Sequence, residues 1–350
     1  MIYIICITYH RVVFIVINDK FIIGVDIGGT RIRVALSKID LHRGSIKVKS
    51  TSTPKENEYS IINSVISLIA EFLNEMNIKS DQILGIGLAS AGPIDTDKGV
   101  VFNNANLGFK VVPLKEPLTK RFPEIPIFVV NDCNAAVLAI HYFEAKEDEK
   151  ENLAYITIST GIGGGVICNG HLLLGKDGNA VEIGHGVLEA RSLYQCNCGA
   201  YGCWEVYSSG TGVKNRALEK IDEMSSSAKI LLYMVDNDKT KITAKEIFQA
   251  AKGADKFSKM IVDQAIFYSK IGVGLVNNHY DCSAIYFGGA MMNDQSMILP
   301  PIIKQFEEDP IPFTINRPPK LKVTKFLDDI GVRGALVFVK YKLEGNSLFE

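Results

Sequence analysis

The sequence predicts an α/β protein built from two similar domains. Two apolar strands joined by a glycine turn occur at residues 21–36, and a second such pair occurs at residues 153–167. A helical pattern and a further apolar strand that ends in a turn follow each pair. A chain of 350 residues is long for one core and suits two. The repeated pattern therefore predicts two α/β domains that face each other across a cleft.

The individual elements follow from local patterns. Short β-branched runs predict strands, and apolar residues at helical spacing predict helices. The run at 144–151 is mostly charged and is typical of a solvated helix end or loop. In the first half we expect strands at 21–25, 31–36, 83–88 and 126–130, and helices at 60–76 and 135–143. In the second half we expect strands at 153–158, 166–167 and 285–287, a glycine turn at 159–165, one helix over 244–276, and loops at 225–227 and 236–240.

Composition and charge exclude some classes of function. The net charge is −1, so no overall positive field attracts nucleic acid or an anionic membrane. Residues 1–20 are apolar, but they lack the leading positive charge and the cleavage site of a signal peptide. His10 and Arg11 interrupt the run, which a membrane span would need unbroken over about 20 residues. An extra strand or a mis-assigned start is favoured over a membrane segment, and the role of this extension stays open.

The glycine turns are suited to binding phosphate. Glycine lets backbone N–H groups approach an anion closely, because no Cβ intervenes. Each turn alone is equally consistent with a structural hairpin, and neither a Walker loop nor a GxGxxG motif is present. Asp26, which ends the first strand, is placed to hold Mg²⁺ through water. The candidate nucleotide-binding residues are Asp26, Gly28, Gly29, Thr30, Thr160, Gly161, Gly163, Gly288 and Gly289.

One imidazole and three thiols form a candidate metal site. His185, Cys196, Cys198 and Cys203 supply the soft four-ligand set that tetrahedral Zn²⁺ prefers. No ligand position is left open, so the expected role is structural. Three reduced cysteines in a loop are the alternative, although Gly199 and Gly202 favour the tight backbone of a metal site.

Several polar residues suit recognition of a hydroxylated substrate. Glu182, His185 and Glu205 flank the cysteines, and Asn131 and Asp132 end a strand before a helix. Phosphoryl transfer needs positioning, charge neutralisation and one base for the attacking hydroxyl. Asp132 could be this base, or it could cap the helix that follows; the local sequence leaves both roles open.

These motifs together resemble the ROK family of sugar kinases and repressors, which belongs to the actin/hexokinase-like superfamily. The resemblance extends from about residue 21 to about residue 340. Its most specific part is the ExGH motif at 182–185 followed by CxCGxxGCxE at 196–205. The other matching segments are VDIGGT at 25–30, VNDCNAA at 130–136, STGIGGG at 159–165, YFGGA at 286–290 and GVRGAL at 331–336.

The resemblance implies a fold and an activity. It implies two actin/hexokinase-like (ribonuclease H-like) domains, one at 21–133 completed by a helix at about 331–345, the other at 134–330 with a zinc-binding loop. The implied reaction is ATP-dependent phosphorylation of a hexose, with glucose as the first candidate substrate and Asp132 as general base. The implied substrate ligands are Asn106, Asn131, Asp132, Glu182, His185 and Glu205, and the implied zinc ligands are His185, Cys196, Cys198 and Cys203.

The resemblance also leaves alternatives. An N-acetylhexosamine kinase would carry the same motifs, and N-acetylmannosamine and N-acetylglucosamine are its candidate substrates. A sugar-responsive repressor is disfavoured, because residues 1–20 are β-like and offer no recognition helix. The segment at 106–109 departs from the family's usual NLPGW, which puts sugar specificity in question more than activity. Family resemblance further implies a cytoplasmic homodimer or homotetramer that uses ATP, Mg²⁺ and structural Zn²⁺.

Overall fold

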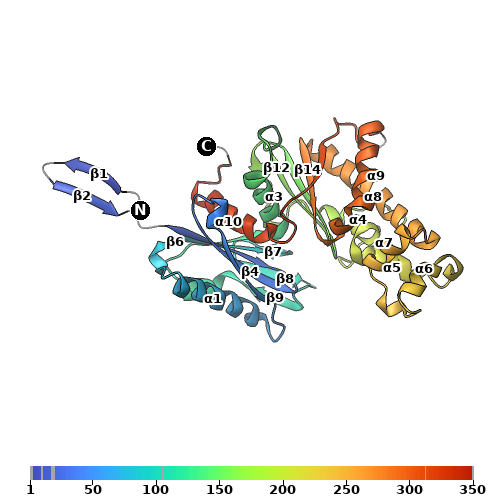
Figure 1. Ribbon diagram of the computed structural model, residues 1–350, viewed down its shortest axis with the longest axis horizontal. Helices are drawn as coiled ribbons and strands as arrows, with labels where there is room; N and C mark the ends of the chain where they lie inside the picture. Colours follow the sequence, from blue (N-terminus) through green and yellow to red (C-terminus); the bar gives the residue numbers. More distant parts are fainter. Residues whose placement is uncertain (1–2, 9–10, 17–19, 105, 312, 349–350) are drawn as a thin grey trace. The chain divides into compact units, whose positions relative to one another are not determined.

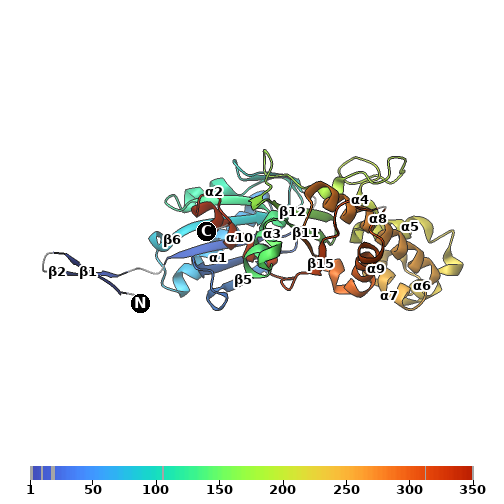
Figure 2. The same ribbon diagram turned by 90° about the horizontal axis from the view of Figure 1, so that it is seen from above.

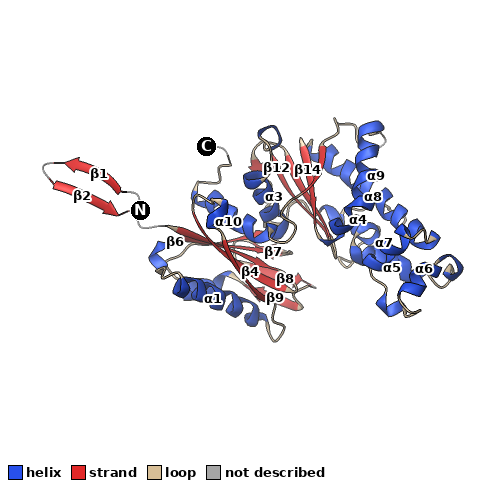
Figure 3. Cartoon of the chain, in the orientation of Figure 1, coloured by secondary structure: helices blue, strands red, loops and turns tan. Residues whose placement is uncertain are grey.

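A computed structural model describes residues 3–8, 11–16, 20–104, 106–311 and 313–348 (Figure 1). The chain forms two compact units, one of residues 1–135 with 331–347 and one of residues 136–330 with 348–350. Each unit contains a five-stranded sheet with helices against it (Figure 3). The predicted α/β class with two sheet-bearing domains is thereby confirmed.

The sheet of the first unit has the order β10-β6-β3-β4-β5. Strands β3, β4 and β5 are antiparallel neighbours, whereas β6 and β10 continue the sheet parallel to β3. The bounds are Phe21–Ile27 for β3, Arg31–Lys38 for β4, Lys47–Ser52 for β5, Ile83–Ser90 for β6 and Ile127–Asn131 for β10.

The sheet of the second unit repeats this arrangement in the order β13-β12-β11-β14-β15. Again three antiparallel strands are followed by two parallel ones, with β11 in the place of β3. The bounds are Leu153–Ile158 for β11, Ile162–Cys168 for β12, His171–Leu172 for β13, Ala284–Gly288 for β14 and Lys320–Val323 for β15. The two strand pairs that the sequence repeats therefore occupy equivalent positions.

Helices cover both faces of the first sheet. Helix α1 (Glu58–Glu75) buries an apolar stripe against Ile23, Val25 and other side chains of one face. Helix α10 (Ile330–Leu343) packs on the other face, where a Cβ on Gly24 would come within 2.7 Å of the Val332 carbonyl oxygen. Each fully buried Ile or Leu of such a helix contributes roughly 1.5–3 kcal/mol to the free energy of unfolding.

The helices of the second unit gather against β11, β12 and β14 (Figures 1 and 2). The helix predicted over 244–276 is instead two helices, α7 (Ala244–Lys252) and α8 (Lys256–Tyr280). The break has a local cause, because Ala254 has φ +65° and the Asp255 carboxylate caps α8 by accepting from the Ser258 N–H. Helix α5 (Gly210–Lys220) and helix α9 (Gln295–Glu308) complete this layer.

The described residues of the apolar N-terminal segment form two strands, where the sequence favoured either an extra strand or a mis-assigned start. β1 (Tyr3–Thr8) and β2 (Arg11–Val16) pair with each other in antiparallel register. Among the described residues, no helix combines the length and the apolar character needed to cross a bilayer.

Shorter elements connect these layers. The helix predicted at 135–143 begins earlier, at Asp132, and forms α3 (Asp132–Phe143). The predicted loop at 225–227 is a turn of 3₁₀ helix, and the predicted loop at 236–240 contains two residues with positive φ, Asp236 and Asn237. The remaining bounds are Ile94–Asp95 for β7, Val100–Asn104 for β8, Phe109–Pro113 for β9, Lys115–Arg121 for α2, Trp204–Ser208 for α4 and Lys229–Met234 for α6.

Candidate functional site

The first glycine turn places a carboxylate at the end of β3. The Asp26 side chain is 16% exposed, and its Oδ2 accepts a hydrogen bond from Arg33 Nη1 at 3.3 Å. Burial raises the pKa of Asp26 from its ordinary 3.8 to about 6; Arg33 opposes this rise, and the nearby negative charge of Asp132 adds to it. Helix α10 begins beside this carboxylate, because a Cβ on Gly331 would lie 2.7 Å from Asp26 Oδ1.

The same turn touches the loop that carries Asn106. A Cβ on Gly29 would come within 2.8 Å of the Asn106 carbonyl oxygen, so only glycine permits this approach. Asn104 Oδ1 accepts hydrogen bonds from the backbone N–H groups of Asn106 and Leu107, at 2.9 and 3.1 Å. Lys55 Nζ donates to the Asn106 carbonyl at 2.7 Å. The Asn106 loop is therefore held against the first glycine turn.

Asn131 and Asp132 lie at the start of helix α3. Asn131 Oδ1 accepts from the Cys133 N–H at 2.8 Å and from the Asn134 N–H at 3.4 Å, so Asn131 caps α3. Asp132 is the first residue of that helix and also accepts from the Cys133 N–H, at 2.8 Å. Burial raises the pKa of Asp132, and the hydrogen bonds from Cys133 partly offset the rise. A carboxylate made more basic in this way is better suited to accept a proton.

The second glycine turn receives a carboxylate from a distant segment. Glu205 Oε2 accepts from the Ile162 N–H at 2.9 Å, and a Cβ on Gly161 would overlap the Glu205 carboxylate. The turn is also shorter than predicted. β12 already begins at Ile162, so the predicted turn residue Gly163 lies in a strand, opposite Thr157.

The loop with Glu182 and His185 packs on the same turn. A Cβ on Gly184 would overlap the Ile162 carbonyl oxygen, which explains the glycine between the two polar residues. The Glu182 side chain is exposed. Glu182, His185, Glu205 and the turn at 159–161 are thus assembled within the second unit.

The four candidate metal ligands converge. One side-chain atom from each of His185, Cys196, Cys198 and Cys203 lies within 4.8 Å of all the others. Cys196 Sγ is 3.6 Å from His185 Nδ1, and Cys198 Sγ is 3.8 Å from Cys203 Sγ. A tetrahedral zinc with Zn–S bonds of about 2.3 Å has S···S edges of about 3.8 Å, so the donor set fits this ion. Cys196 Sγ also contacts Glu205 Oε1 at 3.6 Å, which links the cluster to the second glycine turn.

A cavity of about 670 Å³ adjoins the second glycine turn. Its lining includes Ser159 and Thr160, whose carbonyl oxygens accept from the Gly210 and Thr211 N–H groups at the start of α5. These N–H groups are therefore engaged within the chain, and what the start of α5 offers an anion is the partial positive charge of the helix dipole. Two cations, two apolar side chains and an amide also line the cavity: Lys214, Lys245, Phe248, Met291 and Gln249.

The sequence prediction missed most of this cavity. Of the predicted nucleotide-binding residues, only Thr160 lines it directly, whereas Gly288 and Gly289 precede the lining residues Ala290 and Met291. The available signal was the SSGTG segment at 208–212, a capped and glycine-rich helix start. The two lysines gave no local signal, since they lie on helices far from the turns in sequence.

The predicted residues therefore form two groups. One is in the first unit and the other in the second. The first group contains Asp26, Gly28, Gly29, Thr30, Asn106, Asn131 and Asp132. The second contains Thr160, Gly161, Gly163, Glu182, His185, Cys196, Cys198, Cys203, Glu205, Gly288 and Gly289.

Comparison with known proteins identifies both glucokinases and a xylose repressor among the relatives. The glucokinase of Halalkalibacterium halodurans is 32% identical over 327 residues, which cover 92% of this chain and 96% of that protein. The crystal structure of a ROK family glucokinase from Streptomyces griseus, in complex with glucose and AMPPNP, matches with a TM-score of 0.72 and 28% identity over 91% of this chain and 98% of that chain. The xylose repressor of Bacillus subtilis is 27% identical over 293 residues, 83% of this chain and 70% of that protein. The family profile described as "ROK family" matches residues 22–342, and the chain belongs to the ROK family.

Proposed function

We infer that the protein is an ATP-dependent sugar kinase that phosphorylates glucose. The observation that carries this inference is the 670 Å³ cavity, where a helix N-terminus and two lysines meet the turn that Glu205 contacts. The site thus offers a place for a nucleotide next to a carboxylate suited to a sugar. The similarity to glucokinases over more than nine-tenths of the chain supports the same reaction.

Individual residues have the following roles in the reaction. Asp132 accepts the proton of the attacking sugar hydroxyl, and the sugar oxygen forms a bond to the γ-phosphorus of ATP. The bond from that phosphorus to the β,γ-bridging oxygen breaks, and ADP leaves. Asn106, Asn131, Glu182, His185 and Glu205 orient the sugar through its other hydroxyls.

Mg²⁺ fits the first glycine turn. Asp26 is a largely buried carboxylate at a strand end, beside the start of α10, and burial raises its pKa to about 6 although Arg33 partly offsets the rise. Asp26 would hold the ion, directly or through water. The ion supplies neutralisation of phosphate charge when it is bound.

Zn²⁺ fits the cluster of His185, Cys196, Cys198 and Cys203, and we propose a structural role for it. His185 Nδ1 faces the thiols, so its Nε2 is left for the sugar. Changing Cys198 to Ser should lower both the zinc content and the melting temperature, since metal binding is linked to folding. Cys168, a partly buried cysteine outside the cluster, gives the matched control Cys168→Ser. Full zinc retention by Cys198→Ser would contradict the ligand set.

The repressor function is the other activity known among the relatives. Residues 3–8 and 11–16 form two strands and not a helix-turn-helix, so the described part of the chain gives the repressor no structural support. An N-acetylhexosamine kinase differs only in the sugar. The cytoplasmic location and the homodimer or homotetramer implied by the resemblance stay predictions.

The deciding experiment is a coupled ADP-release assay with Mg-ATP. Glucose, mannose, fructose, N-acetylglucosamine and N-acetylmannosamine are offered separately, with a sugar-free reaction as control. Turnover should be fastest on glucose. Turnover only on an N-acetyl sugar would move the substrate to that class, and folded, zinc-loaded protein that is silent on all five would refute the proposed function.

A further inference from the structure

Val181, the residue before Glu182, has a backbone conformation that its own side chain disfavours. Its φ is +66°, in the left-handed region, where a Cβ crowds the neighbouring carbonyl and a branched Cβ crowds it most. Within the ranges that the structure describes, most other non-glycine residues with positive φ are Asn or Asp, and Val181 is the only β-branched one. Such a conformation costs free energy and persists only where its surroundings impose it.

Contacts on both sides of Glu182 impose the conformation of Val181. The Val181 side chain is 8% exposed and packs on β12, where a Cβ on Gly164 would lie 3.1 Å from Val181 Cγ1. Two residues beyond Glu182, the close approach of Gly184 to the Ile162 carbonyl oxygen fixes the chain to the same strand. The backbone of Glu182 is therefore held between two points on β12.

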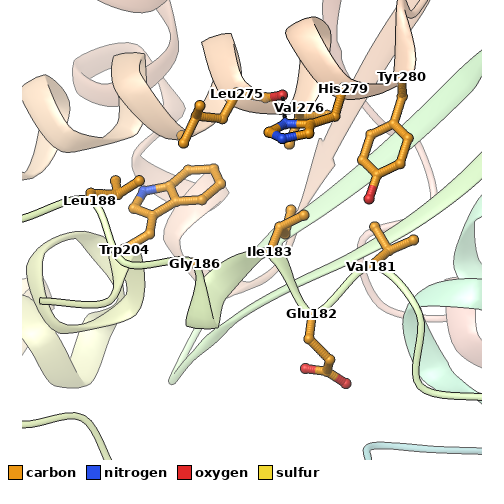
Figure 4. A pocket seen from close by; sticks show the side chains of 11 residues that line it. Val181, Glu182, Ile183, Gly186, Leu188, Trp204, Leu275, Val276, His279 and Tyr280 are labelled. Atoms are coloured by element: carbon orange, nitrogen blue, oxygen red, sulfur yellow. Dashed lines mark hydrogen bonds between the residues drawn. The ribbon is translucent and has the colours of Figure 1, made fainter. Parts of the chain in front are cut away.

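The strained residue determines the direction of the Glu182 side chain. The Ile183 N–H donates to the Val181 carbonyl oxygen at 2.8 Å, and Glu182 has φ −73° and ψ 57°, so Glu182 is the centre of an inverse γ-turn. Figure 4 shows the result, with Val181 and Ile183 pointing toward α8 and the Glu182 carboxylate pointing away from it. Because a change in φ rotates the chain that follows, relief of the strain would displace Glu182.

The loop has space in which to relax. A cavity of about 220 Å³ separates residues 181–188 from the C-terminal half of α8 (Figure 4). Val181 and Ile183 both line this cavity. Their side chains can therefore shift without first displacing the helix.

We propose that Val181 is a positioning residue that lowers the sugar affinity of the free protein. The loop exchanges between the strained conformation, which directs Glu182 away from α8, and a relaxed one, in which Val181 has left the left-handed region. Sugar binds the strained conformation, so the measured affinity is reduced by the fraction of molecules that hold it. This effect on sugar rests on the proposed function, in which Glu182 binds a sugar hydroxyl. The exchange of the loop does not rest on it.

The kinetic test removes the strain in steps. Val181→Gly removes it fully, because glycine adopts the left-handed conformation without a Cβ. The KM for glucose should then fall about fivefold, with kcat and the KM for ATP within about twofold of the wild type. Val181→Ala removes part of the strain and should lower the KM about twofold. Val181→Ile keeps the branched Cβ, adds a methylene next to the cavity and should leave the KM unchanged.

A second control separates strain from lost packing. Val276→Ala removes two methyl groups from the α8 wall of the same cavity and leaves the loop backbone alone, so the KM for glucose should stay at the wild-type value. The proposal is overturned if Val181→Gly leaves the KM unchanged or raises it, or if Val276→Ala lowers it equally. Should Val181→Gly not fold, the comparison of Val181→Ala with Val181→Ile decides in its place.

Hydrogen exchange tests the loop without any kinase activity. The reporter is the Ile183 N–H, which closes the turn onto Val181, followed by mass spectrometry in a peptide that covers residues 180–188 of the free protein. Its exchange should slow about fivefold in Val181→Gly and stay unchanged in Val181→Ile; faster exchange in Val181→Gly overturns the proposal. A protein that phosphorylates none of the five sugars refutes the proposed function and the effect on sugar, and the exchange rates still decide whether Val181 strains the loop.

Discussion

The two glycine turns have the same place in two equivalent sheets, yet they obtain their carboxylates differently. In the first unit, Asp26 belongs to β3 itself and is paired with Arg33 on the adjacent strand. In the second unit, the carboxylate at the turn is that of Glu205, which comes from α4 and is tied to the cysteine cluster. The acid of the first turn is fixed by the sheet, whereas the acid of the second depends on a separate loop.

This difference indicates a division of labour. The first unit holds two carboxylates, Asp26 and Asp132, and the charge of Asp132 adds to the raised pKa of Asp26. The second unit holds Glu205 by a backbone N–H in a position suited to hydroxyl recognition. Substitutions of Asp26 or Asp132 should therefore change kcat, and substitutions at Glu205 should change the KM for the sugar.

The largest effect is expected from Asp132→Asn. The amide keeps the shape of the side chain but cannot accept the hydroxyl proton, so kcat should fall about a hundredfold to ten-thousandfold. The KM for glucose should stay within about threefold, which steady-state kinetics would show. Asp97→Asn, an exposed acid of the same unit, is the control. Near-normal turnover by Asp132→Asn would remove Asp132 from the role of base.

Glu205→Gln should have a smaller effect of the opposite kind. Hydrogen bonds to charged groups contribute about 1.5–3 kcal/mol, so the KM for glucose should rise roughly tenfold to a hundredfold. Glu223→Gln, an exposed acid of the second unit, should leave the KM unchanged. If Glu205→Gln lowered kcat with an unchanged KM, the proposed division between the two turns would be wrong.

The pH dependence tests the first turn alone. Because the pKa of Asp26 is about 6, kcat/KM for ATP should fall as the pH drops through 6 and the carboxylate is protonated. Arg33→Gln removes the opposing charge, so this acid limb should move to higher pH by about one unit. Lys38→Gln, at the exposed end of β4, should leave the limb in place. A limb that is unmoved in Arg33→Gln would show that Asp26 does not govern it.

The same shift has a consequence for stability. The folded-state pKa of Asp26 lies above its ordinary 3.8, so the folded protein binds this proton more tightly than the unfolded chain. The contribution of Asp26 to the free energy of unfolding is therefore complete below about pH 4 and is lost as the pH rises through about 6.

The smallest effect is expected from deletion of residues 2–19. β1 and β2 pair with each other and are not part of the five-stranded sheet of the first unit. The deletion should leave kcat/KM for glucose within about twofold. Changes at surface positions that make no important contact rarely alter the free energy of unfolding by more than about 0.5 kcal/mol. An insoluble or inactive product would show that the hairpin is needed by the first unit.

Local sequence patterns predicted much of this fold. The repeated strand–turn–strand pairs anticipated both sheets, because β-branched runs and glycine turns act over a few residues. The Cys–His spacing also anticipated the convergence of His185 with three cysteines. The break at 253–255 was visible as Gly253 and a capping Asp255, but helical periodicity continued through it and concealed it.

The remainder required tertiary structure. Lys214 and Lys245 reach the large cavity from α5 and α7, and nothing in their immediate neighbours indicates a ligand. The contact between Glu205 and the turn at Gly161 likewise joins segments that lie far apart in the chain. Periodicity reports which face of a helix is buried, but not which other element it meets.

The glycine at 184 has a consequence for how this protein tolerates genetic variation. Even a methyl group at Gly184 would overlap the Ile162 carbonyl oxygen, so no substitution is accommodated without moving the strand. Any amino-acid substitution at this position should reduce the amount of folded protein in a cell. The conservative change Glu205→Gln, which keeps an oxygen to accept the Ile162 N–H, should instead leave abundance intact while growth on the sugar is impaired. Abundance and growth, scored side by side across all variants, would therefore separate residues that build the site from residues that act in it.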